Sequence, residues 1–184
     1  ILAETAWRFA AQFPAPALLD YGTGSGCLAI AIAKNCPKAA ITAIDISSAA
    51  LNTARANAEK NKVTEQLAFF ESDSFGALPP EKRFHLIVAN PPYIPTAEIE
   101  TLQPEVRDHD PHQALDGGPD GLVAFRALAA GVRERLFPGG KLMMEVGDGQ
   151  AVAVVELFEA IGEIEILPDL NNVQRIVVAT VPKP

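Results

Sequence analysis

The sequence has little cysteine, no long apolar run and no excess of basic residues, and each shortage excludes a class of protein. Its two cysteines, Cys27 and Cys36, fall in or just after one predicted helix, so we expect buried, reduced thiols and no disulfide framework. No apolar run approaches the roughly 18 to 20 residues that a membrane helix needs. No basic start followed by an apolar block marks a signal peptide. We therefore expect a cytoplasmic chain that makes no membrane contact.

Positive charge is scarce as well. The chain carries 15 lysines and arginines against 23 acidic residues, for a formal net charge of −8. Gripping a phosphate backbone needs clustered Lys and Arg, so we do not expect direct nucleic-acid binding. Candidate metal ligands are also few. His109 and His112 stand three residues apart, and no cysteine lies near them in the sequence. Two histidines without further ligands are weak evidence for a site, so no metal is expected.

The 184 residues are enough for one sizeable core and too few for two ordinary domains. Apolar stretches of strand length alternate with stretches of helix length, which predicts an α/β domain with a mostly parallel sheet. Two strand-forming segments close the chain and predict an antiparallel edge hairpin. The predicted strands are 17–21, 40–44, 67–70, 86–89, 141–146, 164–167 and 175–181. The predicted helices are 4–13, 27–35, a helix capped by Ser47 or Ser48 and running to about Lys60, 121–136 stopped by Pro138-Gly139-Gly140, and 150–161.

A glycine turn follows the first predicted strand and reads Gly22-Thr23-Gly24-Ser25-Gly26. Glycine lets the backbone turn sharply and lets a ligand approach where a Cβ would clash. The helix that follows presents free N–H groups at its start. The G-x-G-x-G pattern is shorter than the dinucleotide fingerprint and has less provision for a pyrophosphate. S-adenosylmethionine is therefore the favoured ligand, with NAD or a plain tight turn as alternatives.

Two carboxylates end the next two predicted strands. Asp45 can accept hydrogen bonds from both hydroxyls of a ribose, although an Asp near Ser47 could instead cap a helix. After the third strand, Asp73 could accept a hydrogen bond from the adenine amino group. Its neighbours Ser74 and Phe75 belong to the same predicted site, with Phe75 covering a face of the adenine ring. The alternative for Asp73 is an ordinary turn residue.

The fourth predicted strand runs into Asn90-Pro91-Pro92-Tyr93. Two prolines fix φ twice and remove two backbone donors, so the turn is rigid and its carbonyls are free to accept. An amide or aromatic amine nitrogen is a poor nucleophile because its lone pair is delocalised. If its N–H groups donate to the Asn90 side chain and the Pro91 carbonyl, the nitrogen gains electron density and is oriented toward a methyl donor. Tyr93 can then stack on the planar group.

Taken together, the glycine turn and this tetrapeptide resemble the amino-nitrogen methyltransferases, which comprise adenine-N6 enzymes acting on DNA or RNA and glutamine-N5 enzymes acting on proteins. Further segments narrow the resemblance to release factor glutamine methyltransferases: Ala3-Glu4-Thr5, residues 106–111, 114–122 and 145–150, and Asp169 with Arg175. The chain departs from the family pattern at Asp110, where Glu is usual, at Ser74, where an aromatic often stands, and at Asn171-Asn172, where Gly is more common.

The resemblance implies a Rossmann-like, seven-stranded methyltransferase domain over residues 1–184, with S-adenosylmethionine as cofactor. It implies methyl transfer to the glutamine of the Gly-Gly-Gln motif of peptide chain release factors by an enzyme that we expect to be monomeric. It also implies a helical substrate-recognition domain upstream of this chain. The alternatives are a glutamine methyltransferase for a ribosomal protein, an adenine-N6 methyltransferase, and a catalytically silent binding module. Intact glycines and an intact Asn90 to Tyr93 argue against the silent module.

Overall fold

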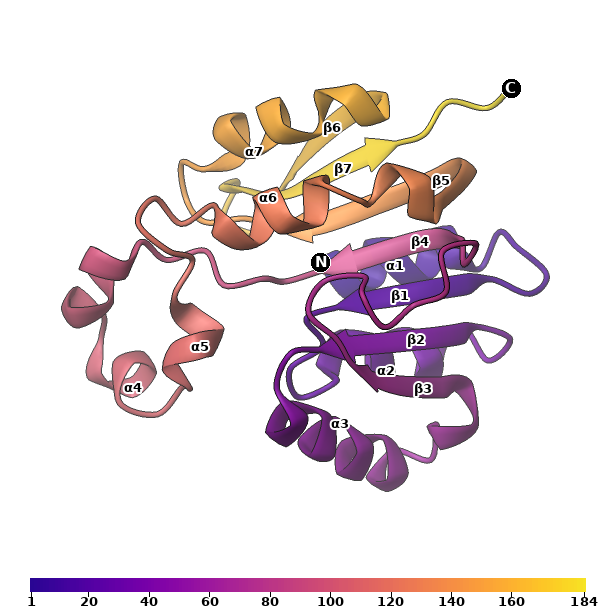
Figure 1. Cartoon of the computed structure of the whole chain (residues 1–184), viewed down its shortest axis with the longest axis horizontal. Coiled ribbons are helices and arrows are strands. Elements are labelled where there is room, and N and C mark those ends of the chain that lie inside the picture. Colours follow the sequence, from indigo (N-terminus) through magenta and orange to yellow (C-terminus); the bar gives the residue numbers. More distant parts are fainter.

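A computed structural model describes all of residues 1–184, which form one seven-stranded sheet with helices on both faces (Figure 1). The strand order is β3-β2-β1-β4-β5-β7-β6. The first five strands are parallel, and β7 runs antiparallel to both β5 and β6. The predicted α/β fold and its antiparallel edge hairpin are therefore confirmed. The strands are β1 (Ala17–Tyr21), β2 (Ala40–Asp45), β3 (Leu67–Glu71), β4 (Phe84–Ala89), β5 (Leu136–Glu145), β6 (Glu163–Pro168) and β7 (Gln174–Thr180).

The helices connect these strands and cover the sheet. The α-helices are α1 (Leu2–Ala10), α2 (Cys27–Asn35), α3 (Ser48–Lys60), α4 (Pro104–Arg107), α5 (His112–Leu115), α6 (Val123–Ala129) and α7 (Ala151–Phe158). Short 3₁₀ turns lie at η1 (Thr64–Gln66), η2 (Thr96–Thr101), η3 (Arg133–Arg135) and η4 (Glu159–Ile161). None of the helices is both long and apolar enough to cross a bilayer.

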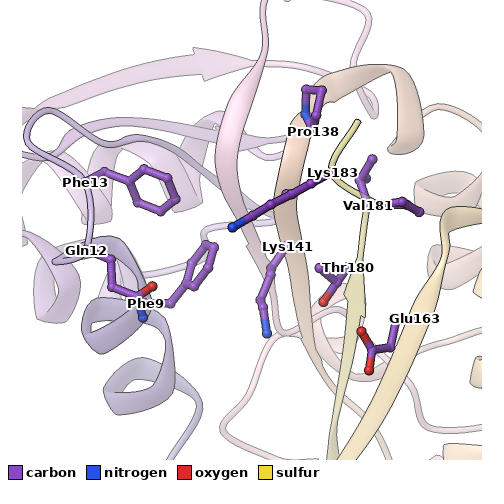
Figure 2. A pocket seen from close by; sticks show the side chains of 11 residues that line it. Phe9, Gln12, Phe13, Pro138, Lys141, Glu163, Thr180, Val181 and Lys183 are labelled. Atoms are coloured by element: carbon purple, nitrogen blue, oxygen red, sulfur yellow. The ribbon is translucent and has the colours of Figure 1, made fainter.

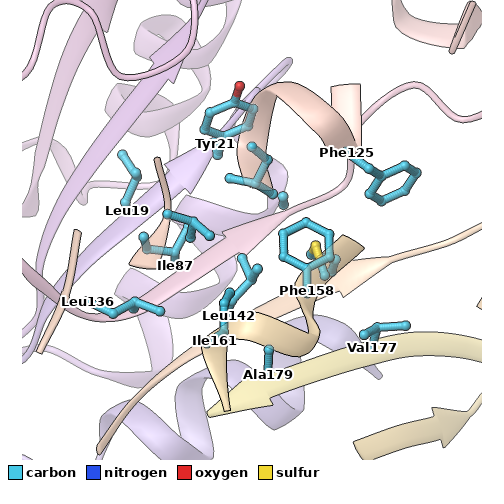
Figure 3. Packing of buried hydrophobic residues seen from close by; sticks show 14 of the residues in the cluster. Leu19, Tyr21, Ile87, Phe125, Leu136, Leu142, Phe158, Ile161, Val177 and Ala179 are labelled. Carbon is cyan, nitrogen blue, oxygen red and sulfur yellow. The ribbon is translucent and has the colours of Figure 1, made fainter. Parts of the chain in front are cut away.

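The core has two layers because successive residues of a strand point to opposite faces of the sheet. Leu18 on β1 packs with α1 and α2, whereas its neighbour Leu19 belongs to the layer under α6 and α7. Met143 and Met144 divide in the same way on β5. Figure 3 shows the second layer, in which Phe125 of α6 and Phe158 of α7 lie over the strand side chains. Burial on both faces explains why the central strands read as nearly continuous apolar runs.

The helix predicted over 121–136 is present as α6, but its predicted end is wrong. The helix α6 ends at Ala129, and the chain passes through η3 into β5, which already begins at Leu136. Gly131 follows the end of α6, where a glycine disfavours further helix and where a Cβ would come within 3.0 Å of the Phe75 ring. The Pro-Gly-Gly segment does not stop a helix. It lies inside β5 as an irregularity at which the register with β4 shifts and Gly139 takes a φ of 76°.

The other predicted elements are present, with ends that differ by a few residues, as expected of fraying ends. The long segment between β4 and α6 carries η2, α4 and α5, and Figure 1 shows it standing beyond the carboxyl ends of the parallel strands. The segment is held at its base. Ile94 bridges to Asp116, and the Thr96 hydroxyl donates to the Asp116 carboxylate at 2.7 Å.

Candidate active site

The predicted site residues gather at the carboxyl edge of the sheet. The strand order reverses direction between β1 and β4, and in open α/β sheets ligands bind at such a switch point. Tyr21 and Ala89, the last residues of these two strands, are register partners. The glycine turn therefore begins directly beside Asn90, and the loops after β2 and β3 flank it on the other side.

The glycine turn has the shape of a cradle. Gly22, Gly24 and Gly26 take φ values of 69°, 54° and 81°, which side chains rarely adopt. A Cβ built on Gly22 or Gly24 would meet nothing within 4 Å, so open space lies over the turn. Gly26 precedes α2 and offers no side-chain cap, so the N–H groups of Cys27 and Leu28 have no partner, whereas the Ala29 N–H donates to Asp20. Space and free donors both suit the polar end of a bound ligand.

Asp20 holds this turn from below, and the sequence analysis did not assign it a role. Its Oδ2 accepts hydrogen bonds from the Thr23 hydroxyl at 2.7 Å and from the Ala29 amide at 3.1 Å. Its Oδ1 is buried without a partner. Burial raises the pKa of Asp20 to about 6, against the lowering effect of its two hydrogen bonds. The Asp20 carboxyl therefore connects the glycine turn to α2 through hydrogen bonds.

Asp45 is half-buried at the end of β2, and both of its oxygens are used within the chain. Oδ2 accepts from the Gly24 amide at 2.8 Å and Oδ1 from the Ser47 amide at 2.9 Å. Ser47 itself caps α3, as predicted, by accepting from the Ala50 amide. The carboxylate thus fixes the glycine turn against β2 while each oxygen keeps acceptor capacity for a ligand hydroxyl. Ile46 beside it is 54% exposed.

The loop after β3 places its predicted residues unequally. Asp73 is exposed and Ser74 is partly buried, with a φ of 53°. That turn sends Phe75 into the core, where it is 8% exposed and its ring lies 5.4 Å from the ring of Tyr21. The structure therefore does not bring Phe75 to the open side of the site. The exposed apolar side chain beside Asp45 is Ile46, which sequence reasoning missed although it directly follows a predicted site residue.

The four residues predicted to be catalytic lie together. Asn90, Pro91, Pro92 and Tyr93 line a cavity of about 190 Å³, which Ile94, Ala114 and Leu115 complete from the segment that carries α5. Asn90 is exposed, and no backbone N–H donates to the Pro91 carbonyl. Two acceptors are therefore free next to a small hollow. That volume suits a slender side chain.

Polar residues from two further segments surround Tyr93, and sequence reasoning assigned none of them to the site. Burial raises the pKa of Tyr93, as does the nearby Glu145 carboxylate, whereas Arg175 lowers it. Arg175 also lies 3.9 Å from Asp169, in the hairpin between β6 and β7. Gln150 donates from Nε2 to the Tyr93 carbonyl at 2.8 Å. Only the fold brings these residues together, although each belongs to a segment that carries the family resemblance.

A second hollow lies at the opposite edge of the sheet. This cavity of about 650 Å³ is lined by Phe9 and Phe13 near α1 and by Lys141 and Lys183 near β5 and β7 (Figure 2). None of the predicted site residues contributes to it.

His112 lies 3.8 Å from Asp116, and no group of three or more His, Cys, Asp or Glu side chains is arranged to hold a metal ion.

Comparisons with known proteins agree with this geometry. Residues 8–105, more than half of the chain, match the model of the methyltransferase small domain. A release factor glutamine methyltransferase of Geobacter sulfurreducens is 44% identical over 179 residues, which are 96% of this chain and 61% of that protein. One from Gloeobacter violaceus is 42% identical over 180 residues, 96% of this chain and 63% of that protein. The chain thus spans about three-fifths of the length of these relatives.

Solved structures share the fold at low sequence identity. A ribosomal protein L11 methylase of Lactobacillus delbrueckii subsp. bulgaricus aligns with a TM-score of 0.69 and 21% identity, over 98% of this chain and 77% of that one. An RNA methyltransferase of Salinibacter ruber, solved with S-adenosyl-L-homocysteine, aligns with a TM-score of 0.61 and 17% identity, over 100% and 89%. The fold is therefore that of these methyltransferases. With the family model and the release factor methyltransferase relatives in agreement, the chain belongs to the methyltransferase small domain family.

Proposed function

We propose that the chain is the catalytic domain of an S-adenosylmethionine-dependent methyltransferase that methylates a glutamine side-chain nitrogen in peptide chain release factors. One observation carries the proposal. The open glycine turn and the cavity of Asn90 to Tyr93 start at paired positions on β1 and β4, so a donor in the first lies next to an acceptor in the second. The relatives that match over nearly the whole chain carry the same activity in their names.

Different residues would bind the methyl donor and the acceptor. When bound, S-adenosylmethionine supplies an electrophilic methyl group on a sulfonium. The first N–H groups of α2 and the Asp45 carboxylate would bind its amino-acid and ribose ends, respectively, and Asp73 its adenine. The apolar side chain of Ile46 is exposed where it can cover the adenine ring.

On the acceptor side, the two amide N–H bonds of the glutamine donate to the Asn90 side-chain oxygen and the Pro91 carbonyl. The nitrogen lone pair forms the new N–C bond as the C–S bond breaks and its electron pair stays on sulfur. One amide proton then leaves to water. Catalysis rests on positioning and on preorganised acceptors, so no strong base is needed.

The surface around the acceptor cavity favours a protein substrate over a nucleobase. The segment from Thr96 to Asp120 is largely exposed and carries Arg107 as its only Arg or Lys against several acids. Such a surface repels phosphates and attracts a basic protein face. A glutamine side chain is slim enough for the small cavity, whereas adenine must be extruded from a stack and needs room. An enzyme with this substrate would work in the cytoplasm, and we propose that it is a monomer.

To test this, the chain is incubated with labelled S-adenosylmethionine and one of three acceptors. These are a release factor, ribosomal RNA and DNA. A longer form encoded by the same gene is tested in the same way. We expect label on the glutamine of the Gly-Gly-Gln motif, located by mass spectrometry. Label in nucleic acid with none on that glutamine would replace the proposal with the adenine alternative, and label on a ribosomal protein would replace the substrate alone.

Replacing Asn90 by alanine tests the mechanism. The variant loses one of two acceptors that orient the amide, so turnover should fall at least about a hundredfold, the usual cost of losing one preorganised polar group. Affinity for S-adenosylhomocysteine should stay within a few-fold, as measured by calorimetry. Near-normal turnover would exclude the acceptor role of Asn90.

A further inference from the structure

The turn Asn90-Pro91-Pro92-Tyr93 has few backbone donors to hold it in place. Proline has no N–H, so two of its four residues cannot donate a backbone hydrogen bond. The backbone of the turn must therefore be held through carbonyl oxygens, by donors that come from elsewhere. The Pro91 carbonyl has no backbone partner in the chain and is the one that the proposed mechanism needs free. The Pro92 carbonyl has no backbone partner either, and the Tyr93 carbonyl is the one that accepts a hydrogen bond from a side chain.

Gln150 supplies that fixed point. Its Nε2 donates to the Tyr93 carbonyl at 2.8 Å, and its Oε1 accepts from the Gly147 amide at 2.9 Å. Its own backbone amide donates to the Gly147 carbonyl at 3.1 Å, so Gln150 is clamped at the start of α7. A primary amide carries an NH2 donor group and a carbonyl acceptor in one plane, and each makes a hydrogen bond here. The hydrogen bonds of Gln150 thereby connect the loop after β5 to the loop after β4.

Three glycines let this contact form, because each leaves room beside Tyr93 or Gln150. A Cβ on Gly117 would lie 2.8 Å from the Tyr93 Cα, and one on Gly147 would lie 2.5 Å from Gln150 Oε1. A Cβ on Gly121 would overlap the Tyr93 carbonyl oxygen and lie 2.5 Å from Gln150 Nε2. Separations under 3.0 Å are essentially never seen for real Cβ atoms, so the backbone around Tyr93 is enclosed from two loops.

We propose that Gln150 is a positioning residue for methyl transfer. By holding the Tyr93 carbonyl it sets the position of the tyrosine ring, which forms a wall of the acceptor cavity, and leaves the Pro91 carbonyl to the substrate. This inference rests on the proposed function for its effect on turnover. The positional effect on Tyr93 stands by itself and is measured separately below.

Two variants separate a positioning role from a merely structural one. Gln150→Met keeps the size of the side chain and removes both hydrogen bonds, so turnover should fall at least about tenfold while S-adenosylhomocysteine affinity stays within about threefold. Gln150→Glu matches the amide only when the carboxyl is protonated, because an ionised carboxylate cannot donate to a carbonyl. Its turnover relative to the parent should therefore recover as the pH falls from about 8 to about 5.5.

Other charged groups near the site are the same in the parent and in the variant, so the ratio of their turnovers isolates the effect of residue 150. Glu145 and Arg175 face Tyr93, and Asp148 and Asp169 stand on the adjoining loops in parent and variant alike. Gln12→Glu is the matched control, since Gln12 is exposed at the opposite edge of the sheet. Its ratio to the parent should not depend on pH.

A spectroscopic measurement tests the same idea without any substrate. The chain has two tyrosines, so ¹³C-labelled tyrosine gives two sets of ring signals, which Tyr93→Phe assigns. Gln150→Met should shift or broaden the Tyr93 signal and leave that of Tyr21 unchanged. In Gln150→Glu the Tyr93 signal should move from the parent position at low pH to the Gln150→Met position at high pH. The parent and Gln12→Glu should show neither change.

The outcomes distinguish the two hypotheses. If the parent methylates no glutamine but the Tyr93 signal responds as described, the proposed function fails and the positioning of Tyr93 by Gln150 stands. If the parent is active and Gln150→Met keeps full turnover, or the Gln150→Glu ratio is flat with pH, the positioning role in catalysis is wrong. An unchanged Tyr93 signal in a folded Gln150→Met variant overturns the inference altogether.

Discussion

At the scale of single residues, two carboxylates hold the glycine turn through hydrogen bonds. Asp45 accepts hydrogen bonds from the Gly24 and Ser47 amides while its oxygens keep acceptor capacity. Asp20 holds the same turn from the buried side. Ser47 and not Asp45 caps α3, and the ribose-binding role of Asp45 stays a prediction that its remaining acceptor capacity allows.

Replacing Asp45 by alanine should weaken S-adenosylhomocysteine binding by about ten- to a hundredfold. The ribose loses a charged acceptor, and such hydrogen bonds are worth about 1.5 to 3 kcal/mol each. Calorimetry measures the loss. Asp45→Asn is the matched variant, because its amide oxygen still accepts, so its affinity should lie between those of the parent and the alanine variant. Equal affinity in all three would remove Asp45 from the ligand site.

Replacing Asp20 by asparagine should change how stability depends on pH. The pKa of Asp20 is raised from 3.8 to about 6, so the folded chain holds this proton more tightly than the unfolded chain. The associated stability is full below about pH 4 and is lost as the pH rises through about 6. A shift of about two units corresponds to about 3 kcal/mol. Urea unfolding of parent and Asp20→Asn should thus show a stability difference that grows by up to this amount, in favour of the variant, between pH 4 and pH 8. A constant difference would contradict this.

Phe75 shows where residue-level prediction stops. An aromatic residue two positions after Asp73 is well placed in the sequence to cover an adenine, but direction depends on backbone dihedrals. Ser74 takes a positive φ and turns the next side chain inward to Tyr21. No local propensity announces a positive φ at a serine. The exposure of Ile46 could not be predicted from the sequence either, because it depends on which side chains pack against it.

At the scale of elements, strands were easier to predict than the segment from Gly121 to Gly140. The buried central strands leave nearly continuous apolar runs, and the glycine turn marks the end of the first. The end of α6 and the start of β5 gave no such signal, because the residues from Arg133 to Arg135 favour a helix and no proline stands between Gly121 and Pro138. Contacts distant in sequence decided the boundary: Gly131 packs against Phe75, and Leu136 pairs with Phe84 of β4.

Alanine at Gly121 should cost more than alanine at Gly149, although both take nearly the same φ, 73° and 75°. The left-handed conformation alone costs a non-glycine residue about 1 to 2 kcal/mol. A Cβ at Gly149 meets nothing within 4 Å, so Gly149→Ala should lose only that much. Gly121→Ala also overlaps the Tyr93 carbonyl, so it should be less stable in urea and should lose turnover. Equal behaviour of the two variants would show that the enclosure of Tyr93 carries no cost.

At the scale of the whole molecule, the fold and the two halves of the site were predictable, whereas the shell around Tyr93 was not. The cofactor loop and the tetrapeptide are each continuous in sequence, so local chemistry identifies them. Glu145 and Gln150 come from one segment and Arg175 from another, and only the sheet topology brings both beside Tyr93. A pattern of spacing cannot specify such a cluster without the strand order.

A ligand that binds only the folded chain should stabilise the whole molecule. S-adenosylhomocysteine at about a hundred times its dissociation constant should add about 2.7 kcal/mol to the free energy of unfolding. Thermal unfolding with and without ligand measures the shift in midpoint, and at the same ligand concentration Asp45→Ala should show a smaller one. No shift for the parent would mean that the glycine turn does not bind this nucleoside.

The position of β7 also sets an order of assembly. β7 follows β6 in the sequence but lies between β5 and β6, and it is the only neighbour that β6 has. β6 therefore cannot join the sheet before β7 has paired with β5, and until then β5 is an unpaired edge that invites association with another chain. Arg175 lies on β7, so the surroundings of Tyr93 are completed in that late pairing. Kinetically, the glycine turn and the loop after β2 can therefore form before the surroundings of Tyr93 are complete.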